Sequence, residues 1–124
     1  MKTRQQPLFL LLLFFFAFGF LLSNNYRDYI YSNGIYDFGI ADAGANLFVV
    51  PILSIFMFIS QPKLDTTTVV LRVTFFYSIA EIASIIFPML GVFDIADLIA
   101  YLVGANLIMF TIKRLKVVNR LPLR

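Results

Sequence analysis

Residues 8–22 read LFLLLLFFFAFGFLL, and this stretch carries no polar side chain. Three further apolar blocks follow, at about residues 44–59, 69–90 and 95–112. A helix rises about 1.5 Å per residue, so crossing a hydrocarbon layer of ~30 Å takes about 20 residues. The blocks are continuous, lack period-two alternation and are too long for barrel strands, which favours helices. The sequence therefore predicts an all-α integral membrane bundle of four transmembrane helices.

The composition supports a membrane protein. Of the 124 residues, 60% are hydrophobic and only 14% are charged, whereas an ordinary soluble domain carries about 25% charged residues. A soluble chain of this size needs a polar surface over a modest core, and too few polar residues are present to form one. The chain has no Cys and no His, which excludes disulfides, thiol catalysis and the commonest general base and metal ligand. We therefore expect no cofactor, assign no catalytic residue, and favour a binding role over an enzyme activity.

The predicted helices cover about residues 7–23, 43–60, 68–90 and 95–113, within a single membrane domain of residues 1–124. The second and third connections are short, which makes consecutive helices antiparallel neighbours. The first connection, YRDYIYSNGIYDFGIADA, contains Asn33-Gly34, a pair that favours a tight turn. This connection is interpreted either as a small hairpin or, preferably, as a segment whose tyrosines lie along the membrane interface.

Positive charge predicts the orientation of the helices. With four spans, nine cations fall on one side of the membrane: Lys2, Arg4, Lys63, Arg72, Lys113, Arg114, Lys116, Arg120 and Arg124. Arg27 alone falls on the other side, together with Asp28, Asp37, Asp42, Asp94 and Asp97. By the positive-inside rule both termini are cytoplasmic. We expect a protein of the cell membrane whose basic tail favours anionic membrane lipids rather than nucleic acid.

The first apolar block has an alternative interpretation as a cleaved signal peptide, because it has a basic start and an apolar centre. However, its exit reads Leu22-Ser23-Asn24-Asn25-Tyr26 and contains no small-x-small cleavage pattern. We therefore expect the first helix to be retained.

Glu81 is the most informative residue, because the predicted boundaries place it at least about 13 Å from either end of its helix. A lone ionised carboxylate at that depth costs at least ~2.5 kcal/mol, so it should be protonated, paired or in contact with water. Other polar residues recur at spacings of three and four on the same helix: Thr74, Tyr77, Ser78 and Ser84. A stripe of this kind is expected to face protein or water rather than lipid.

The fourth helix carries a matching face. Asp94, Asp97, Tyr101 and Gly104 are spaced three, four and three residues apart. We expect the Tyr101 hydroxyl to reach the Glu81 carboxyl, and Asp97 to cap the start of the helix. Gly104 should allow neighbouring helices to approach closely.

Asn46 opens the second helix, and Pro51 should bend that helix one turn later. Asn46 either caps its own helix or forms a hydrogen bond across the bundle, and capping is favoured. Asn106 lies on the opposite side of the fourth helix from Tyr101, where it contacts either the first helix or a second copy of the chain. The sequence does not decide between these two contacts.

The polar residues admit a structural and a functional interpretation. In the structural one, Glu81 holds two helices in register and the aspartates cap a helix. In the functional one, an acidic cleft open to the outer face binds a cationic or hydroxyl-rich group of a lipid or small molecule. The candidate binding residues are Asn46, Glu81, Asp94, Asp97, Tyr101 and Gly104. No metal site is assigned, although Asp94 and Asp97 remain a remote candidate pair for Mg²⁺ or Ca²⁺.

Residues 80–105, AEIASIIFPMLGVFDIADLIAYLVGA, resemble the VanZ-like family of small bacterial membrane proteins. The matching positions are Glu81, Gly91, Phe93, Asp94, Asp97 and Gly104. A related group of short membrane proteins is more similar, with a pattern F-D-x-x-D-x-x-A-Y-x-x-G that extends to Ala100 and Tyr101. The sequence departs from the VanZ-like pattern at Asn46, Ser84, Val92 and Tyr101. The resemblance implies a multi-pass protein of the bacterial cytoplasmic membrane with a role in the cell envelope, since the namesake is linked to glycopeptide resistance.

Two other functions remain open. The first is a small proton-coupled transporter, in which Glu81 would take up and release a proton as substrate binds. The second is a structural subunit of a larger membrane complex or a homo-oligomer, with Asn106 and the Phe-rich first helix as contact surfaces.

Overall fold

The computed structural model describes residues 5–61 and 63–118, the side chains of 116–118 excepted. The predictions for the side chains of Lys2, Arg4, Lys116, Arg120 and Arg124 lie outside this part of the chain. Across the described residues the fold is helical and contains no strand. Four helical segments are long and apolar enough to cross a membrane: Gln6–Asn33, Ile40–Ser60, Thr66–Ala83 and Ile95–Leu115. The prediction of an all-α chain with four membrane-spanning segments is confirmed at this level.

The first span extends well beyond its predicted end near residue 23. It consists of α1 (Gln6–Leu21), a π-helical turn η1 (Leu22–Tyr26) and α2 (Arg27–Asn33), which follow one another without a break. Residues 23–33 are largely polar but contain neither Pro nor Gly, so the helix continues beyond the end of the apolar block. The helix ends at Gly34, whose φ of 61° is the left-handed conformation that glycine adopts readily. The hairpin interpretation of Asn33-Gly34 is therefore wrong, because these two residues form a helix C-terminus.

The second span changes helix type along its length. It consists of α3 (Ile40–Ala43), a 3₁₀ turn η2 (Gly44–Phe48) and α4 (Val49–Ser60). Pro51 lies in the first turn of α4 and has no N–H with which to bond the Leu47 carbonyl one turn earlier. The irregular turn η2 thus ends three residues before Pro51, at which the sequence predicts a bend.

The third span ends earlier than predicted. Helix α5 (Thr66–Ala83) begins at Asp65, whose carboxylate accepts the Thr68 N–H at 3.0 Å. It ends at Ala83 rather than near residue 90, because Pro88 cannot continue a helix and disfavours helical backbone just before it. Residues 84–94 form an irregular segment that contains the short 3₁₀ turn η3 (Pro88–Leu90). The last helix, α6 (Ile95–Val118), begins where the sequence predicts and runs beyond residue 113.

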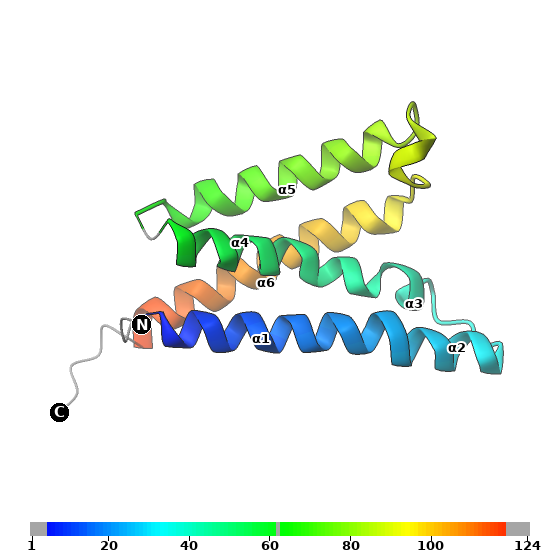
Figure 1. The fold of residues 1–124 in the computed structure, drawn as a ribbon, viewed down its shortest axis with the longest axis horizontal. Coiled ribbons are helices and arrows are strands. Elements are labelled where there is room, and N and C mark those ends of the chain that lie inside the picture. Colours follow the sequence, from blue (N-terminus) through cyan, green and yellow to red (C-terminus); the bar gives the residue numbers. More distant parts are fainter. Residues whose placement is uncertain (1–4, 62, 119–124) are drawn as a thin grey trace.

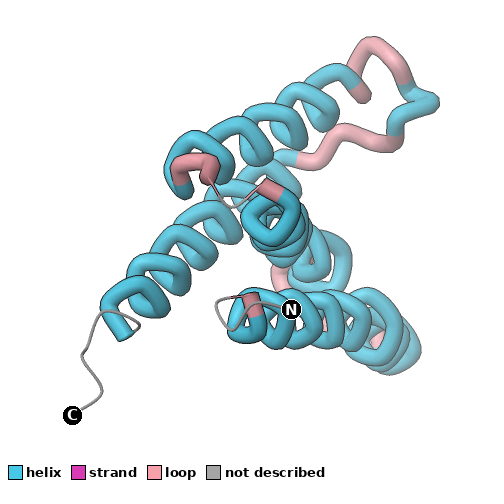
Figure 2. Tube along the Cα trace, turned by 60° about the vertical axis from the view of Figure 1, so that its left-hand side comes forward, coloured by secondary structure: helices cyan, strands magenta, loops and turns pink. Residues whose placement is uncertain are grey.

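Helix α4 lies at the centre of the bundle and contacts α1, α5 and α6 (Figures 1 and 2). Helices α5 and α6 also contact each other, whereas the backbone of α1 does not come close to either of them within the described residues. Helix α1 begins at the same end of the bundle at which α6 ends, as Figure 1 shows. The Phe and Leu side chains around most of α1 are exposed, as expected for a helix that faces lipid.

The two ends of the bundle differ in charge. We call one end, where α2 closes and α6 begins, the acidic end, after six carboxylates: Asp28, Asp37, Asp42, Glu81, Asp94 and Asp97. We call the opposite end, where α4 meets α5 and α6 closes, the basic end. Its described cations are Lys63, Arg72, Lys113 and Arg114.

Gly104 sets the distance between α4 and α6. A Cβ atom at Gly104 would lie 2.2 Å from the Leu47 carbonyl oxygen and 3.1 Å from Pro51 Cδ. The glycine hydrogen in that place points at the carbonyl to which Pro51 cannot donate, as in a weak Cα–H···O contact. Val50 and Ile108 are fully buried on the same two helices. The predicted close approach at Gly104 is confirmed.

Candidate functional site

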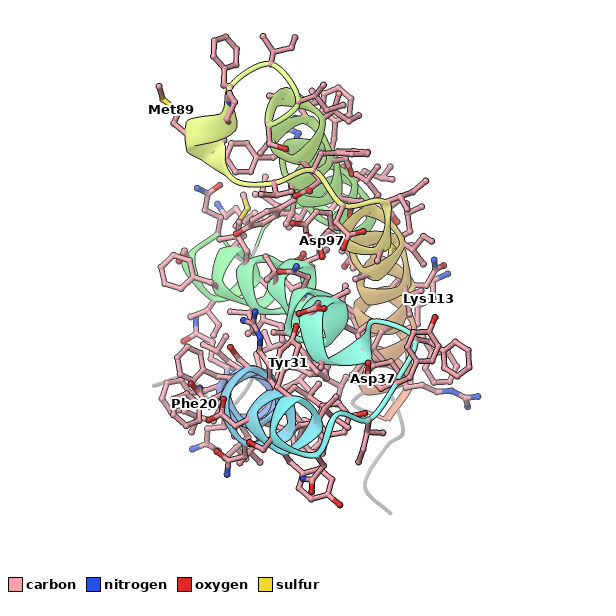
Figure 3. All side chains as sticks on the ribbon, turned by 90° about the vertical axis from the view of Figure 1, so that its right-hand side faces the viewer. Phe20, Tyr31, Asp37, Met89, Asp97 and Lys113 are labelled. Carbon is pink, nitrogen blue, oxygen red and sulfur yellow. The ribbon has the colours of Figure 1, made fainter. Side chains whose placement is uncertain are left out.

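Polar side chains from three parts of the chain meet at the acidic end. Figure 3 shows this end, with Asp97 near the middle between α6 and the second span, which consists of α3, η2 and α4. Met89 projects from the 84–94 segment in the same view. The Asn46 amide donates a hydrogen bond of 2.7 Å to Asp97 Oδ1. Asn46 was expected to cap its own helix, and that prediction is wrong because Ala43 precedes η2 and no side chain caps it. The hydrogen bond instead joins η2 to the first turn of α6.

Asp94, and not Asp97, caps α6. Asp94 Oδ1 accepts the Ala96 N–H at 2.8 Å, and the Asp94 carbonyl accepts the Asp97 N–H at 3.1 Å. This arrangement satisfies N–H groups that have no partner inside the helix, and it places negative charge at the positive end of the helix dipole. The prediction that Asp97 is the cap is wrong, because the helix begins at Ile95 and Asp97 already lies in its first turn.

Glu81 lies near the end of α5 and not in the middle of a span. The helix ends two residues later, at Ala83, so the predicted depth of about 13 Å is replaced by a position next to the 84–94 segment. Glu81 Oε1 accepts the Asp94 N–H at 2.8 Å. This carboxylate therefore bonds an amide that precedes α6 and closes the loop between the two helices.

Tyr101 is the buried member of the cluster. Its side chain is 6% exposed, and its ring lies 5.5 Å from the ring of Tyr77 between centroids. The Tyr101 hydroxyl lies within electrostatic range of Glu81 and Asp97. The predicted juxtaposition of Tyr101 with Glu81 is therefore present. Gly104, one turn further along α6, belongs to the packing contact with α4 and not to this polar cluster.

The negative charges at this end act on one another. Asp97 lies within electrostatic range of Asp42, Glu81 and Asp94, and it is only partly exposed. Like charges held together in a partly buried region repel, and the repulsion favours a bound cation or proton. Among the described residues, no group of three or more His, Cys, Asp or Glu side chains is placed to hold a metal ion.

A second polar contact at this end, between Asp42 and the pair Arg27 and Tyr31, was not predicted from the sequence. Arg27 Nη2 lies 3.6 Å from Asp42 Oδ1, and the Tyr31 hydroxyl donates to the same oxygen. The Arg27 guanidinium also lies over the Tyr31 ring, 5.5 Å from its centroid. Arg27 and Tyr31 lie in the segment that was predicted to be a connection. Their i, i+4 spacing would have indicated a helix face if that segment had been taken as helical.

The remaining polar predictions are local. Thr74 is buried and donates to the Val70 carbonyl at 2.7 Å, and the exposed Asn106 amide donates to the Leu102 carbonyl at 2.9 Å. The backbones of α1 and α6 do not approach each other closely within the described residues, and no hydrogen bond joins Asn106 to the first helix there. Its amide lies on a face of the bundle that is open to lipid or to another chain.

Four apolar helices and a polar cluster at one end define this chain as a multi-pass membrane protein. No protein-family model, no curated protein and no solved structure matches it. The VanZ-like resemblance therefore remains a prediction from the sequence.

Proposed function

We propose that this is a VanZ-like protein of the cell envelope whose acidic end binds a cationic or hydroxyl-rich group of a lipid or small molecule. The observation that supports the proposal is the position of Asp97, which has three other carboxylates within electrostatic range. The basic termini favour an orientation with both termini inside, and the VanZ-like resemblance favours the bacterial cytoplasmic membrane; in this proposal the acidic end lies at the outer face. A ligand would then reach the cluster from outside the cell.

The cluster has unused capacity to bind such a group. Asp94 and Asp97 each use Oδ1 for a bond within the protein, while no described residue donates a hydrogen bond to either Oδ2. Arg27, the one described cation at the acidic end, pairs with Asp42. An ammonium or hydroxyl group would therefore find free carboxylate oxygens and an uncompensated negative potential.

The test is retention of a cationic lipid by the purified full-length protein in native mass spectrometry. Lysyl-phosphatidylglycerol carries a net positive headgroup, and phosphatidylglycerol with the same acyl chains is the anionic control. We expect Asp97→Asn and Asp94→Asn to lower retention of the cationic lipid about tenfold, as loss of a charge-assisted hydrogen bond would. Each substitution introduces an amide whose oxygen can still accept the Asn46 or Ala96 N–H, so the fold is retained.

The matched control is Asp28→Asn, which removes an exposed carboxylate on α2 at the same end of the bundle. It should leave retention unchanged, because no other carboxylate or polar cluster member contacts it among the described residues. Equal loss in the Asp28 and Asp97 variants would show that only general charge attracts the lipid. Equal retention of the cationic and anionic lipids by the unmodified protein would refute the proposal.

The two other functions have different signatures. A proton-coupled transporter would show substrate-driven proton movement in vesicles that Glu81→Gln abolishes. The position of Glu81 beside a loop, where its carboxylate accepts the Asp94 N–H, gives this function less support than a mid-span position would. A structural subunit would co-purify with a fixed partner in mild detergent and would be unstable alone.

A further inference from the structure

An open groove runs along the surface between α5 and α6, with a volume of about 490 Å³. Its lining residues are Leu71, Arg72, Thr74, Phe75, Ser78 and Leu102. Five of these belong to α5, and Leu102 forms the wall from α6. Arg72 is the one charged residue among them. The groove is separate from the acidic cluster and shares no residue with it.

Arg72 is unusual because it lies inside a span and has no partner among the residues that the structure describes. It follows the first residue of α5 by six positions, about 9 Å along the helix. Its side chain is exposed, and no described residue forms an ion pair or hydrogen bond with it. A long Arg side chain can extend toward the membrane interface, yet a guanidinium beside hydrocarbon is stabilised only when an anion or water accompanies it.

We propose that this groove binds one anionic glycerophospholipid of the surrounding membrane. The Arg72 guanidinium pairs with the lipid phosphate, for which its planar fork of donors is well suited. One acyl chain lies along the groove against Leu71, Phe75 and Leu102. The volume falls within the roughly 300–1,000 Å³ of sites that hold small molecules, so a chain segment fits.

The charge distribution favours a lipid over a second copy of this chain. Six of the seven carboxylates lie at the acidic end, away from Arg72. The seventh, Asp65, caps α5 through the Thr68 N–H. A second copy inserted in the same orientation would therefore bring almost no negative charge to the groove, whereas each anionic lipid brings a phosphate to the height that Arg72 can reach.

The test compares lipids on the intact full-length protein in native mass spectrometry. Phosphatidylglycerol and phosphatidylcholine with identical acyl chains are offered at equal concentration. We expect the protein to retain phosphatidylglycerol preferentially, and Arg72→Gln to lower that retention about tenfold. Leu102→Trp, which fills the groove while keeping Arg72, should lower it as well. Both side chains are exposed, so thermal unfolding should remain unchanged and confirm that each variant folds.

The control is Arg114→Gln, which removes one positive charge from the same end of the bundle but outside the groove. The Arg114 guanidinium lies over the Phe110 ring, 5.0 Å from its centroid, and its removal should leave lipid retention unchanged. An equal loss in the Arg114 and Arg72 variants would overturn the proposal in favour of general charge attraction. Unchanged retention in Leu102→Trp, or equal retention of the two lipids, would also overturn it. A dimer that either groove variant abolishes would assign the groove to a second copy instead.

Discussion

The acidic end and the basic end use their charged side chains in opposite ways. At the acidic end, Asp94 caps α6, Asp97 accepts the Asn46 amide and Glu81 accepts a loop N–H. At the basic end, Lys63, Arg72, Lys113 and Arg114 form no ion pair within the described part of the chain. The acidic side chains therefore help to build the fold, whereas the basic ones project from it.

This difference follows from what each charge can reach. A helix start offers free N–H groups, which carboxylates accept directly, and the acidic end contains the start of α6 together with an irregular loop. Long cationic side chains need no partner within the protein, because lipid phosphates and water surround the interface. Substitutions that separate folding from ligand binding should therefore behave differently at the two ends.

The largest expected effect on the free energy of unfolding is at Gly104, where α6 packs closely against α4. Gly104→Ala would put a Cβ 2.2 Å from the Leu47 carbonyl oxygen, which is backbone and cannot rotate away. We expect the free energy of unfolding to fall by about 1–3 kcal/mol, the range for overpacked interiors. Titration with sodium dodecyl sulfate in mixed micelles would measure this change.

Gly19→Ala is the matched control, because its Cβ would make an ordinary contact 3.6 Å from Phe48 Cβ. Alanine is a better helix former than glycine by about 1 kcal/mol, so Gly19→Ala should be neutral or stabilising. If both substitutions had the same effect, the close approach of α6 to α4 at Gly104 would be incorrect.

A smaller effect is expected at the hydrogen bond between Asn46 and Asp97. In a double-mutant cycle of Asn46→Ala and Asp97→Ala, we expect a coupling energy of about 1 kcal/mol, since such bonds across membrane helices are modest. The readout is again the free energy of unfolding in mixed micelles. Asn106→Ala provides the comparison, because Asn106 is exposed and, among the described residues, donates only to the Leu102 carbonyl of its own helix. A coupling energy near zero would remove Asp97 from the structural part of the acidic end.

The existence and number of the membrane-spanning helices could be predicted from the sequence, because continuous apolarity depends on composition alone. Their ends could not be predicted from apolarity. Residues 23–33 are largely polar and still helical, while residues 85–87 are apolar and lie outside α5. Hydropathy measures preference for lipid, whereas Pro88 and Gly34 determine where the backbone can continue as a helix.

The residues that form the candidate site could be predicted from the sequence, but the hydrogen bonds between them could not. The i, i+3 and i, i+4 spacings placed Asp94, Asp97 and Tyr101 on one face, and that face does meet Glu81. The bond between Asn46 and Asp97 joins residues that are 51 positions apart. No local spacing contains that information, because it depends on how η2 packs against α6. The start of α6 was predicted correctly at residue 95, but the cap was assigned to Asp97 inside the first turn rather than to Asp94, the residue that precedes the helix.

The smallest effects on stability are expected at the basic end. Arg72→Gln and Lys113→Gln remove exposed charges that have no partner among the described residues, so the free energy of unfolding should change by less than about 0.5 kcal/mol. Asp94→Ala removes one charge at the acidic end and, with it, a helix cap, so it should cost about 1 kcal/mol. All three are measured in the same mixed micelles. An equal loss in the Arg72 and Asp94 variants would mean that the basic end also contributes to the fold. If Arg72→Gln leaves the free energy of unfolding unchanged but lowers lipid retention, the Arg72 charge serves binding, whereas the Asp94 charge serves the fold.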